Sequence, residues 1–237
     1  MTGKWENEMD IHGLQKLTLL DYPGHVACTL FLGGCDLRCP YCHNAELIDG
    51  TARPLFTDAE VLDFLRKRRG LLDGVAVTGG EPLLRDLAPL LTEIRALGYP
   101  VKLDTNGTHP ARLRALLEAG LLDYVAMDVK NAPARYAETV GLPAFDLGPV
   151  RDSVALLREL APDYEFRTTA VAELHDDKSF PAIGELIAGA RRWFLQPFTD
   201  RDSVPFSGLH APGRAELERW LGLVRPFVQE AALRGLD

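Results

Sequence analysis

The stretch Val26–Cys42, VACTLFLGGCDLRCPYC, joins an apolar strand to a loop that carries three cysteines. Its first seven residues are apolar or β-branched, which is typical of a strand buried on both faces of a sheet. Two glycines follow, and they allow the backbone to turn tightly. The spacing C-x3-C-x2-C then lets three thiolates face a single point: Cys35, Cys39 and Cys42. We therefore expect a metal centre on the loop that leaves this strand.

The rest of the chain alternates apolar strands with helical segments. After the first strand, Val26–Leu32, the expected strands are Gly74–Thr78, Val101–Asp104, Tyr124–Val129, Glu165–Val171 and Trp193–Gln196. The expected helices run from the capping residue Thr57 to about Arg69, then over Asp86–Leu97, Pro110–Ala119, Val150–Leu160 and Phe180–Arg191, with a last helix that starts near Pro212 and breaks at Pro226. Six strand-then-helix units predict a parallel sheet with helices outside it.

The fold that we expect is α/β, an open partial (β/α)6 barrel that resembles an incomplete TIM barrel. A doubly wound open sheet is the alternative, and periodicity alone does not separate the two. In both folds, functional residues gather at the C-terminal ends of the strands. We expect one domain over residues 1–237, with a core at about 11–200 and a C-terminal helical segment at about 211–237.

Composition excludes several classes of protein. The chain has 237 residues, of which 46% are hydrophobic and 25% charged, as in ordinary globular domains. Its formal net charge of −8 is opposite to the balance of proteins that clamp nucleic acid. The four cysteines lie between positions 28 and 42, which favours an intracellular metal site over a disulfide framework. We expect a cytoplasmic protein with no nucleic-acid or membrane partner.

Two kinds of metal centre fit the cysteine loop. A [4Fe–4S] cluster normally takes four thiolates, so three cysteines leave one iron open to another ligand. The alternative is a zinc site completed by His43 or Cys28. His43 directly follows the third cysteine and is poorly placed to reach the same ion. Cys28 lies inside the strand, where we expect it to act as a small buried apolar residue.

Polar motifs end the neighbouring strands at the same edge of the predicted sheet. Thr78–Pro82 (TGGEP) contains two glycines whose backbone a ligand carboxylate or amine can approach closely. Asp104–Gly107 (DTNG) and Asp128–Lys130 (DVK) end the next two strands. Arg167 lies within a core strand, where a charged residue is rarely buried unpaired. We expect it to point into the barrel, toward a carboxylate or a ligand.

The loop Gly34–Asn44 (GCDLRCPYCHN) resembles the cluster loop of the radical S-adenosylmethionine (SAM) superfamily, and its CHN ending is similar to that of the activating enzymes of glycyl-radical enzymes. The preceding stretch Gly13–Gly24 (GLQKLTLLDYPG) resembles the activating proteins of anaerobic ribonucleoside-triphosphate reductase. Pyruvate formate-lyase activases usually have Asp-Gly-Pro-Gly where this chain has Asp21-Tyr22-Pro23-Gly24. The resemblance extends from about residue 11 to 200 and implies an open barrel of the radical SAM type.

The resemblance implies an activase. Cys35, Cys39 and Cys42 would hold a [4Fe–4S] cluster, and the open iron would bind the amino and carboxylate groups of SAM. One electron would cleave SAM and release a 5′-deoxyadenosyl radical, which would take a hydrogen atom from a glycine of a glycyl-radical enzyme. The expected partner enzyme is anaerobic ribonucleotide reductase. Because four cysteines leave no room for a second all-cysteine cluster, we expect a flavodoxin or ferredoxin as electron donor.

The resemblance also implies a set of binding residues. Phe198 is expected against the adenine, because this chain has Thr199 and no histidine in the region where pyruvate formate-lyase activases place one. A monovalent cation is expected at Asp104, Thr105 and Asp128, which offer hard oxygen ligands. The full set expected to bind SAM is Tyr41, Gly79, Gly80, Glu81, Asp104, Asn106, Asp128, Lys130, Arg167 and Phe198.

Three alternative functions stay open. The first is an activase of a pyruvate formate-lyase-type enzyme. The second is a radical SAM enzyme that acts on a small molecule such as a deazaguanine precursor, although those enzymes often have an altered cysteine spacing. The third is a zinc- or cluster-bearing interaction module without turnover. Iron content and light absorption near 400 nm would separate a zinc-bearing module from the other two.

Overall fold

The computed structural model describes residues 9–49 and 53–235, and these form one eight-stranded sheet whose strands lie side by side in chain order. The first strand is antiparallel to the second, and every later pair is parallel. The strands are β1 (Ile11–Thr18), β2 (Ala27–Leu32), β3 (Gly74–Gly79), β4 (Val101–Thr105), β5 (Tyr124–Asp128), β6 (Tyr164–Ala170), β7 (Arg192–Pro197) and β8 (Glu230–Leu233).

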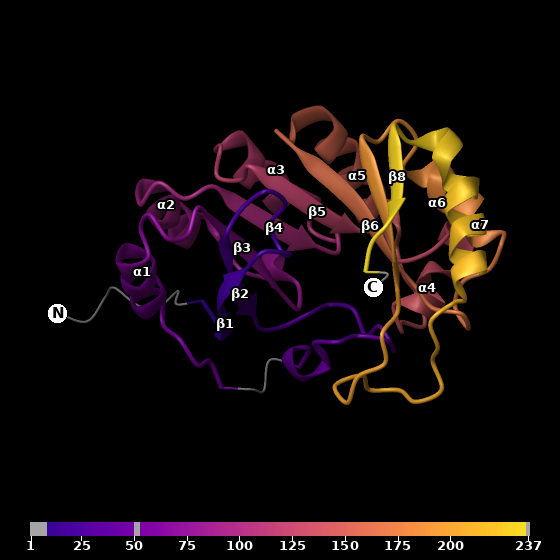
Figure 1. Cartoon of the computed structure of the whole chain (residues 1–237), viewed down its shortest axis with the longest axis horizontal. Helices are drawn as coiled ribbons and strands as arrows, with labels where there is room; N and C mark the ends of the chain where they lie inside the picture. Colours follow the sequence, from indigo (N-terminus) through magenta and orange to yellow (C-terminus); the bar gives the residue numbers. More distant parts are fainter. Residues whose placement is uncertain (1–8, 50–52, 236–237) are drawn as a thin grey trace.

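The longer helices follow one another around the outer side of the curved sheet (Figure 1). They are α1 (Asp58–Lys67), α2 (Ala88–Ala96), α3 (Pro110–Glu118), α5 (Gly148–Leu160), α6 (Ser179–Leu186) and α7 (Arg214–Val224). The short elements are α4 (Tyr136–Thr139) and four 3-10 turns, Ala45–Leu47, Pro82–Leu84, Pro133–Arg135 and Arg225–Phe227. The predicted capping box opens α1: Thr57 Oγ1 accepts from the amide of Glu60, and the Glu60 carboxylate accepts from the amide of Thr57.

The strand order decides between the two predicted folds. A doubly wound sheet reverses its order at a switch point, whereas here β2 to β7 follow one another without reversal. Within the part of the chain that the structure describes, β1 and β8 do not pair, so the sheet does not close. The prediction of an open partial barrel with six strand-then-helix units is confirmed.

Alternation along the strands separates an apolar layer from a polar one. On β4, Val101 and Leu103 belong to the hydrophobic core between the sheet and the helices. Lys102 and Asp104 point to the other face of the strand, into the barrel. On β6, Phe166 lies in the core, and the ion pairs of Glu165 lie on the barrel side. The interior of this barrel therefore carries charged side chains that lead up to the strand ends.

Two edge strands were not expected from the sequence. β1 is half exposed and contains few apolar residues. It lies at one edge of the sheet, where β2 is its only neighbour among the described strands. β8 is four residues long, and its sequence EAAL carries no strand signal. The expected C-terminal helical segment is therefore wrong beyond α7, because Pro226 ends the helical region and the chain returns to pair with β7. No helix in residues 9–49 or 53–235 is both long and apolar enough to cross a membrane.

Candidate active site

The loop that leaves β2 is held by backbone hydrogen bonds on several sides. The Gly34 amide donates to the Leu47 carbonyl, and the Cys35 amide donates to Ile48. Farther along, the Arg38 amide donates to the carbonyl of Val140, after α4. These bonds fix the path of the cysteine loop before any ligand binds, which reduces the conformational entropy that a ligand would have to overcome.

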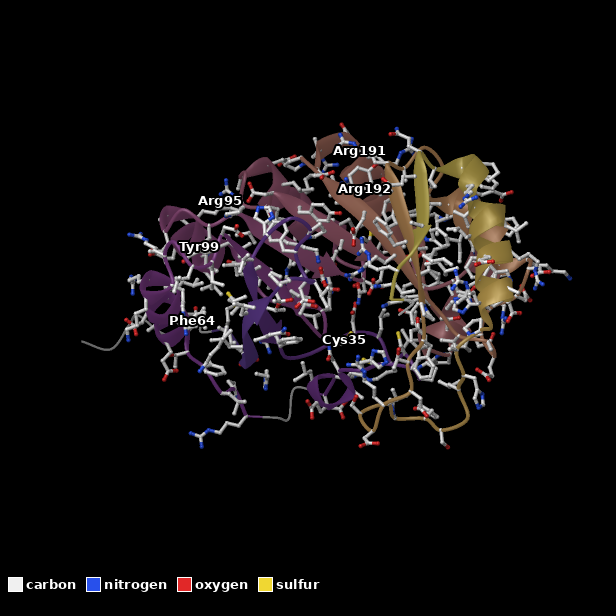
Figure 2. All side chains as sticks on the ribbon, viewed as in Figure 1. Cys35, Phe64, Arg95, Tyr99, Arg191 and Arg192 are labelled. Atoms are coloured by element: carbon white, nitrogen blue, oxygen red, sulfur yellow. The ribbon has the colours of Figure 1, made fainter. Side chains whose placement is uncertain are left out.

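All three cysteines of the loop line one pocket at the C-terminal ends of the strands. Cys35 lies at the opposite end of the strands from Arg191 and Arg192, which stand at the start of β7 (Figure 2). The lining residues are Cys35, Leu37, Cys39, Tyr41, Cys42, His43, Asn44, Ile48, Thr78, Gly79, Gly80, Asp104, Thr105, Asn106, Asp128, Lys130, Arg167 and Thr169. Of the fourteen residues expected to bind a cofactor or a metal, all except Glu81 and Phe198 are in this set.

Cys28 is separate from the pocket. Its side chain is fully buried in the hydrophobic core, as the sequence predicted, and burial raises the pKa of its thiol to about 12. Burial also raises the pKa of Cys35 to about 12 and that of Cys39 to about 11, so their protons are displaced when metal binds. Among the described residues, no three His, Cys, Asp or Glu side chains are already gathered around one metal-ion position.

The two glycines of TGGEP join β3 to the cysteine loop. The amides of Gly80 and Glu81 donate to the carbonyls of Leu32 and Gly34, so these two amides are not available to a ligand. A Cβ at Gly80 would lie 2.0 Å from the Gly34 carbonyl oxygen. Asn44 Nδ2 donates to the carbonyl of Gly79 at 3.0 Å. The motif therefore holds the cysteine loop in position, and we call this contact surface the seat of the loop. The motif also presents its backbone to the pocket.

Glu81 is not among the residues that line the pocket, so the structure does not support the expectation that it contacts a ligand. It is fully buried and accepts hydrogen bonds from the amides of Leu83 and Asn106, at 3.0 and 2.6 Å, and from Thr105 Oγ1 at 2.8 Å. Burial raises the pKa of Glu81 to about 7, against the lowering effect of these three donors. Asn106 in turn directs its Nδ2 to Cys35 Sγ at 3.9 Å and to Asp36 Oδ1 at 2.9 Å. Glu81 is thus a positioning residue for Asn106.

Charged side chains on β4, β5 and β6, and just after β5, form a row at one wall of the pocket. Lys102 bonds Asp104, and Arg167 joins Asp104 to Asp128 at 3.2 and 3.0 Å. Lys130 completes the row with a bond of 2.8 Å to Asp128. Burial would raise the pKa of both carboxyl groups, but Arg167 and the lysines hold each pKa below its ordinary value. Both aspartates are therefore ionised at neutral pH, and the prediction that Arg167 points to a carboxylate is confirmed.

His43, and not Phe198, presents its ring to the pocket. Phe198 is 2% exposed and stacks behind His43 with ring centroids 5.8 Å apart and an interplanar angle of 14°. His43 Nε2 donates to the carbonyl of Thr199 at 2.6 Å, which fixes the ring. This arrangement does not support the expected contact of Phe198 with the ligand, because His43 lies over the Phe198 ring. In the sequence, His43 stood out only as a possible zinc ligand, because it follows Cys42. Sequence reasoning therefore missed that the His43 ring lines the pocket.

Tyr41 supplies a polar atom without a protein partner. Its side chain lies in the pocket wall, and its hydroxyl is buried with no hydrogen-bond partner among the described residues. A buried hydroxyl without a partner is costly, so a polar ligand atom would stabilise it. Together with three thiols, which are ligands suited to iron–sulfur clusters, this orphaned group fits a pocket that holds both a cluster and a polar organic molecule.

Comparison with protein families agrees with this chemistry. The model described as the Radical SAM superfamily matches residues 29–177, more than half of the chain. The chain belongs to the radical SAM superfamily. Radical SAM enzymes use a [4Fe–4S] cluster and SAM, and the pocket residues fit both groups.

Several named radical SAM proteins are similar in sequence. A Methanocaldococcus jannaschii protein with the provisional name glycyl-radical enzyme activating enzyme is 29% identical over 240 residues, which cover 96% of each chain. A pyruvate formate-lyase-activating enzyme of Clostridium pasteurianum is 31% identical over 51% of this chain and 52% of its own. A 7-carboxy-7-deazaguanine synthase of Synechocystis is 30% identical over 46% and 48%. The chain thus spans about half the length of the last two relatives.

Solved structures of radical SAM proteins share the fold. Streptococcus suis SuiB, bound to its precursor peptide SuiA, superposes with a TM-score of 0.67 at 16% identity, over 85% of this chain and 47% of SuiB. A domain of a pyruvate formate-lyase-activating enzyme from Bacteroides vulgatus gives a TM-score of 0.56 at 16% identity, over 68% of this chain and 99% of that domain. At these identities the likeness supports the open barrel alone.

Proposed function

We propose that the chain is an activase that uses SAM to remove a hydrogen atom from a backbone glycine of a glycyl-radical enzyme. The observation that carries the proposal is the match over 96% of both chains to a protein with the provisional name glycyl-radical enzyme activating enzyme. The cysteine loop with its CHN ending, which lies in the pocket at the strand ends, supports the same function. The finer proposal, that the partner is anaerobic ribonucleotide reductase, is supported by the stretch Gly13–Gly24.

In such an enzyme, different residues of the pocket would hold the cluster and bind SAM. Cys35, Cys39 and Cys42 would hold the cluster, which supplies one electron for the reductive cleavage of SAM. Asn106, set by Glu81, donates toward Cys35 Sγ and thereby orients that ligand.

The row of charged side chains and two residues of the cysteine loop, Tyr41 and His43, would bind SAM. Arg167 and Lys130 offer positive charge to a carboxylate, since the row of charged side chains has three cations and two anions. His43, held from behind by Phe198, offers a ring face to an adenine. Tyr41 lines the pocket as well, and its hydroxyl has no hydrogen-bond partner among the described residues.

A polypeptide substrate requires an accessible site. Within the described residues the sheet is open, with β1 and β8 at its two edges, and the pocket lies at the strand ends instead of within a closed barrel. This geometry supports access for a loop that carries a glycine. The electron would come from a flavodoxin or ferredoxin, because the three pocket cysteines serve one cluster and Cys28 is buried elsewhere.

The proposal is tested by mixing the reconstituted protein anaerobically with SAM, a reductant and the anaerobic ribonucleotide reductase of the same organism. We expect an electron paramagnetic resonance doublet of a glycyl radical on the reductase. The doublet should be absent when the acceptor glycine of the reductase is changed to alanine, and also when Cys39→Ala replaces the activase. A silent reductase with a fully active pyruvate formate-lyase-type enzyme would overturn the finer proposal and keep the activase function.

A second candidate function has one specific observation in its favour. The Synechocystis relative at 30% identity is a 7-carboxy-7-deazaguanine synthase, so a small-molecule substrate is the alternative. Release of 5′-deoxyadenosine in proportion to such a small molecule, with no radical on any glycyl-radical enzyme, would favour this second function.

A further inference from the structure

Lys102 is a buried cation that no sequence motif singled out. It lies on β4 next to the pocket wall, and its side chain is 2% exposed. Its Nζ donates to Asp104 Oδ1. Its partner in register on β3 is the small residue Ala76. A lysine this deeply buried requires a specific anionic partner, and Asp104 provides it.

With Lys102 in place, each carboxylate oxygen of the two pocket aspartates accepts from a cationic side chain. Asp104 Oδ1 accepts from Lys102 and Oδ2 from Arg167 Nη1. Asp128 Oδ1 accepts from Arg167 Nε and Oδ2 from Lys130 Nζ. Three cations and two anions leave this group of five side chains with one excess positive charge.

The expected monovalent cation does not fit this arrangement. A metal ion at Asp104 and Asp128 would lie among three positive groups, which already use the four oxygens that it would need. The third expected ligand is also engaged, because Thr105 Oγ1 donates to Glu81 Oε1 and accepts from the amide of Gly107. The expectation of a sodium or potassium site at these residues is therefore not supported.

We propose that Lys102 is a built-in cation behind the pocket wall, whose ammonium group gives Asp104 the charge that a monovalent metal ion would otherwise bring. Ligand binding at this wall then needs neither Na⁺ nor K⁺. Without the lysine, the four remaining side chains carry no net charge, and Asp104 Oδ1 becomes free to bind an ion. The proposal concerns the SAM site and extends the proposed function, but its first test below requires no partner enzyme and no turnover.

The first test compares melting temperatures of the protein in NaCl, KCl and choline chloride at equal ionic strength. Choline is too large for a buried carboxylate site, so it serves as the inert salt. For the wild-type protein we expect the three melting temperatures to agree within about 1 °C, because screening is the same in each salt.

Lys102→Met keeps the stem of the side chain and removes the charge. In choline chloride we expect its melting temperature to fall by about 6 °C or more, because Asp104 loses one partner of a buried ion pair. NaCl or KCl should recover at least about half of this loss, since the metal ion takes the place of the ammonium group. The matched control is Lys67→Met, an exposed lysine paired with Asp63 on α1, which should respond alike to all three salts.

The double variant Lys102→Met with Asp104→Asn removes the unpaired carboxylate as well. Its melting temperature should not depend on the choice of salt, which assigns the ion effect of the single variant to Asp104. The second test measures SAM binding to the reconstituted proteins. The wild-type dissociation constant should vary less than about twofold among the salts, whereas that of Lys102→Met should weaken about tenfold in choline chloride and recover in NaCl or KCl.

Two results would overturn the proposal. If the wild-type protein binds SAM well only in NaCl or KCl, a metal ion works beside Lys102, and the lysine is not its substitute. If Lys102→Met is destabilised equally in all three salts, Lys102 is a structural residue. Should that variant not fold, the wild-type salt series and Lys102→Gln, which keeps a polar group without the charge, decide the question in the same way. Loss of activase function with intact salt behaviour would count against the proposed function instead.

Discussion

Cys28 and Cys35 are close in the sequence but lie in different surroundings. Cys28 packs among the apolar residues between sheet and helices, whereas Cys35 lies in the pocket beside Asn106. The spacing of the other cysteines separated the two residues correctly at the level of sequence. The contact with Asn106 could not be predicted, because it depends on a turn after β4 that is far away in the chain.

Iron binding follows this division. After anaerobic reconstitution, we expect about four iron atoms per chain in the wild-type protein and in Cys28→Ala. Cys35→Ala, Cys39→Ala and Cys42→Ala should each lose the cluster, because the loop provides only three thiolates and the cluster needs all of them. Iron analysis and the absorbance near 400 nm measure both outcomes. Loss of iron from Cys28→Ala with retention in one of the other three would contradict the assignment.

Glu81 is the second residue whose role depends on burial. In Glu81→Gln, an amide NH₂ replaces one carboxylate oxygen and faces a donor, either the Asn106 amide or Thr105 Oγ1 and the Leu83 amide. We expect a loss of about 1–3 kcal/mol in the free energy of unfolding, measured in urea, together with faster release of iron. Glu118→Gln is the control, since Glu118 is exposed on α3. Equal stability of the two variants would refute the positioning role.

At the scale of elements, six strands and their helices could be predicted because apolar runs and helix caps recur regularly. β1 and β8 could not, because edge strands bury little and their pairing depends on distant neighbours. The pocket wall was predicted in part: Asp104 and Asp128 follow from their positions at strand ends, and Arg167 follows from being a charged residue within a core strand. Lys102 was missed because a lysine two residues before an aspartate matches no known sequence motif. Its burial and its pairing with Asp104 become visible only in the folded barrel.

The contact between β3 and the cysteine loop gives a prediction for an element. In Gly80→Ala the added Cβ would lie 2.0 Å from the Gly34 carbonyl oxygen, so the loop must move away from its seat. We expect this variant to lose most of its cluster and SAM binding in equilibrium binding experiments. Gly222→Ala on α7 is the matched control, since its Cβ meets open space and should stabilise the helix by about 0.5–1 kcal/mol. Normal cluster content in Gly80→Ala would contradict the seating role.

At the scale of the whole molecule, the C-terminal end of the described chain stabilises the interior of the barrel. Arg234 follows β8, and its guanidinium donates to both oxygens of Glu165 at 2.7 and 3.0 Å. Glu165 is buried and also accepts from the Tyr124 hydroxyl at 2.6 Å. The guanidinium lies 3.7 Å from the ring centroid of Phe194. This group connects β5, β6 and β7 with the residue that follows β8.

Arg234→Met should therefore destabilise the fold as a whole. The variant leaves the Glu165 carboxylate with Tyr124 as its remaining partner, and we expect a loss of about 3 kcal/mol in the free energy of unfolding. Adding Glu165→Gln should restore part of this loss, because the unpaired charge is then removed. Arg214→Met, which breaks an exposed pair with Glu218, should change stability by less than about 0.5 kcal/mol. Equal effects of the two arginine variants in urea denaturation would refute the role of Arg234.

The central claim is hydrogen abstraction from a glycine of another protein, and isotope transfer tests it most directly. Anaerobic ribonucleotide reductase is prepared with glycine deuterated at Cα and mixed with the reduced activase and SAM. Mass spectrometry of the released 5′-deoxyadenosine should then detect one transferred deuterium for each glycyl radical formed. Unlabelled 5′-deoxyadenosine, released while a radical forms on the reductase or while a small molecule is consumed, would contradict direct abstraction from glycine.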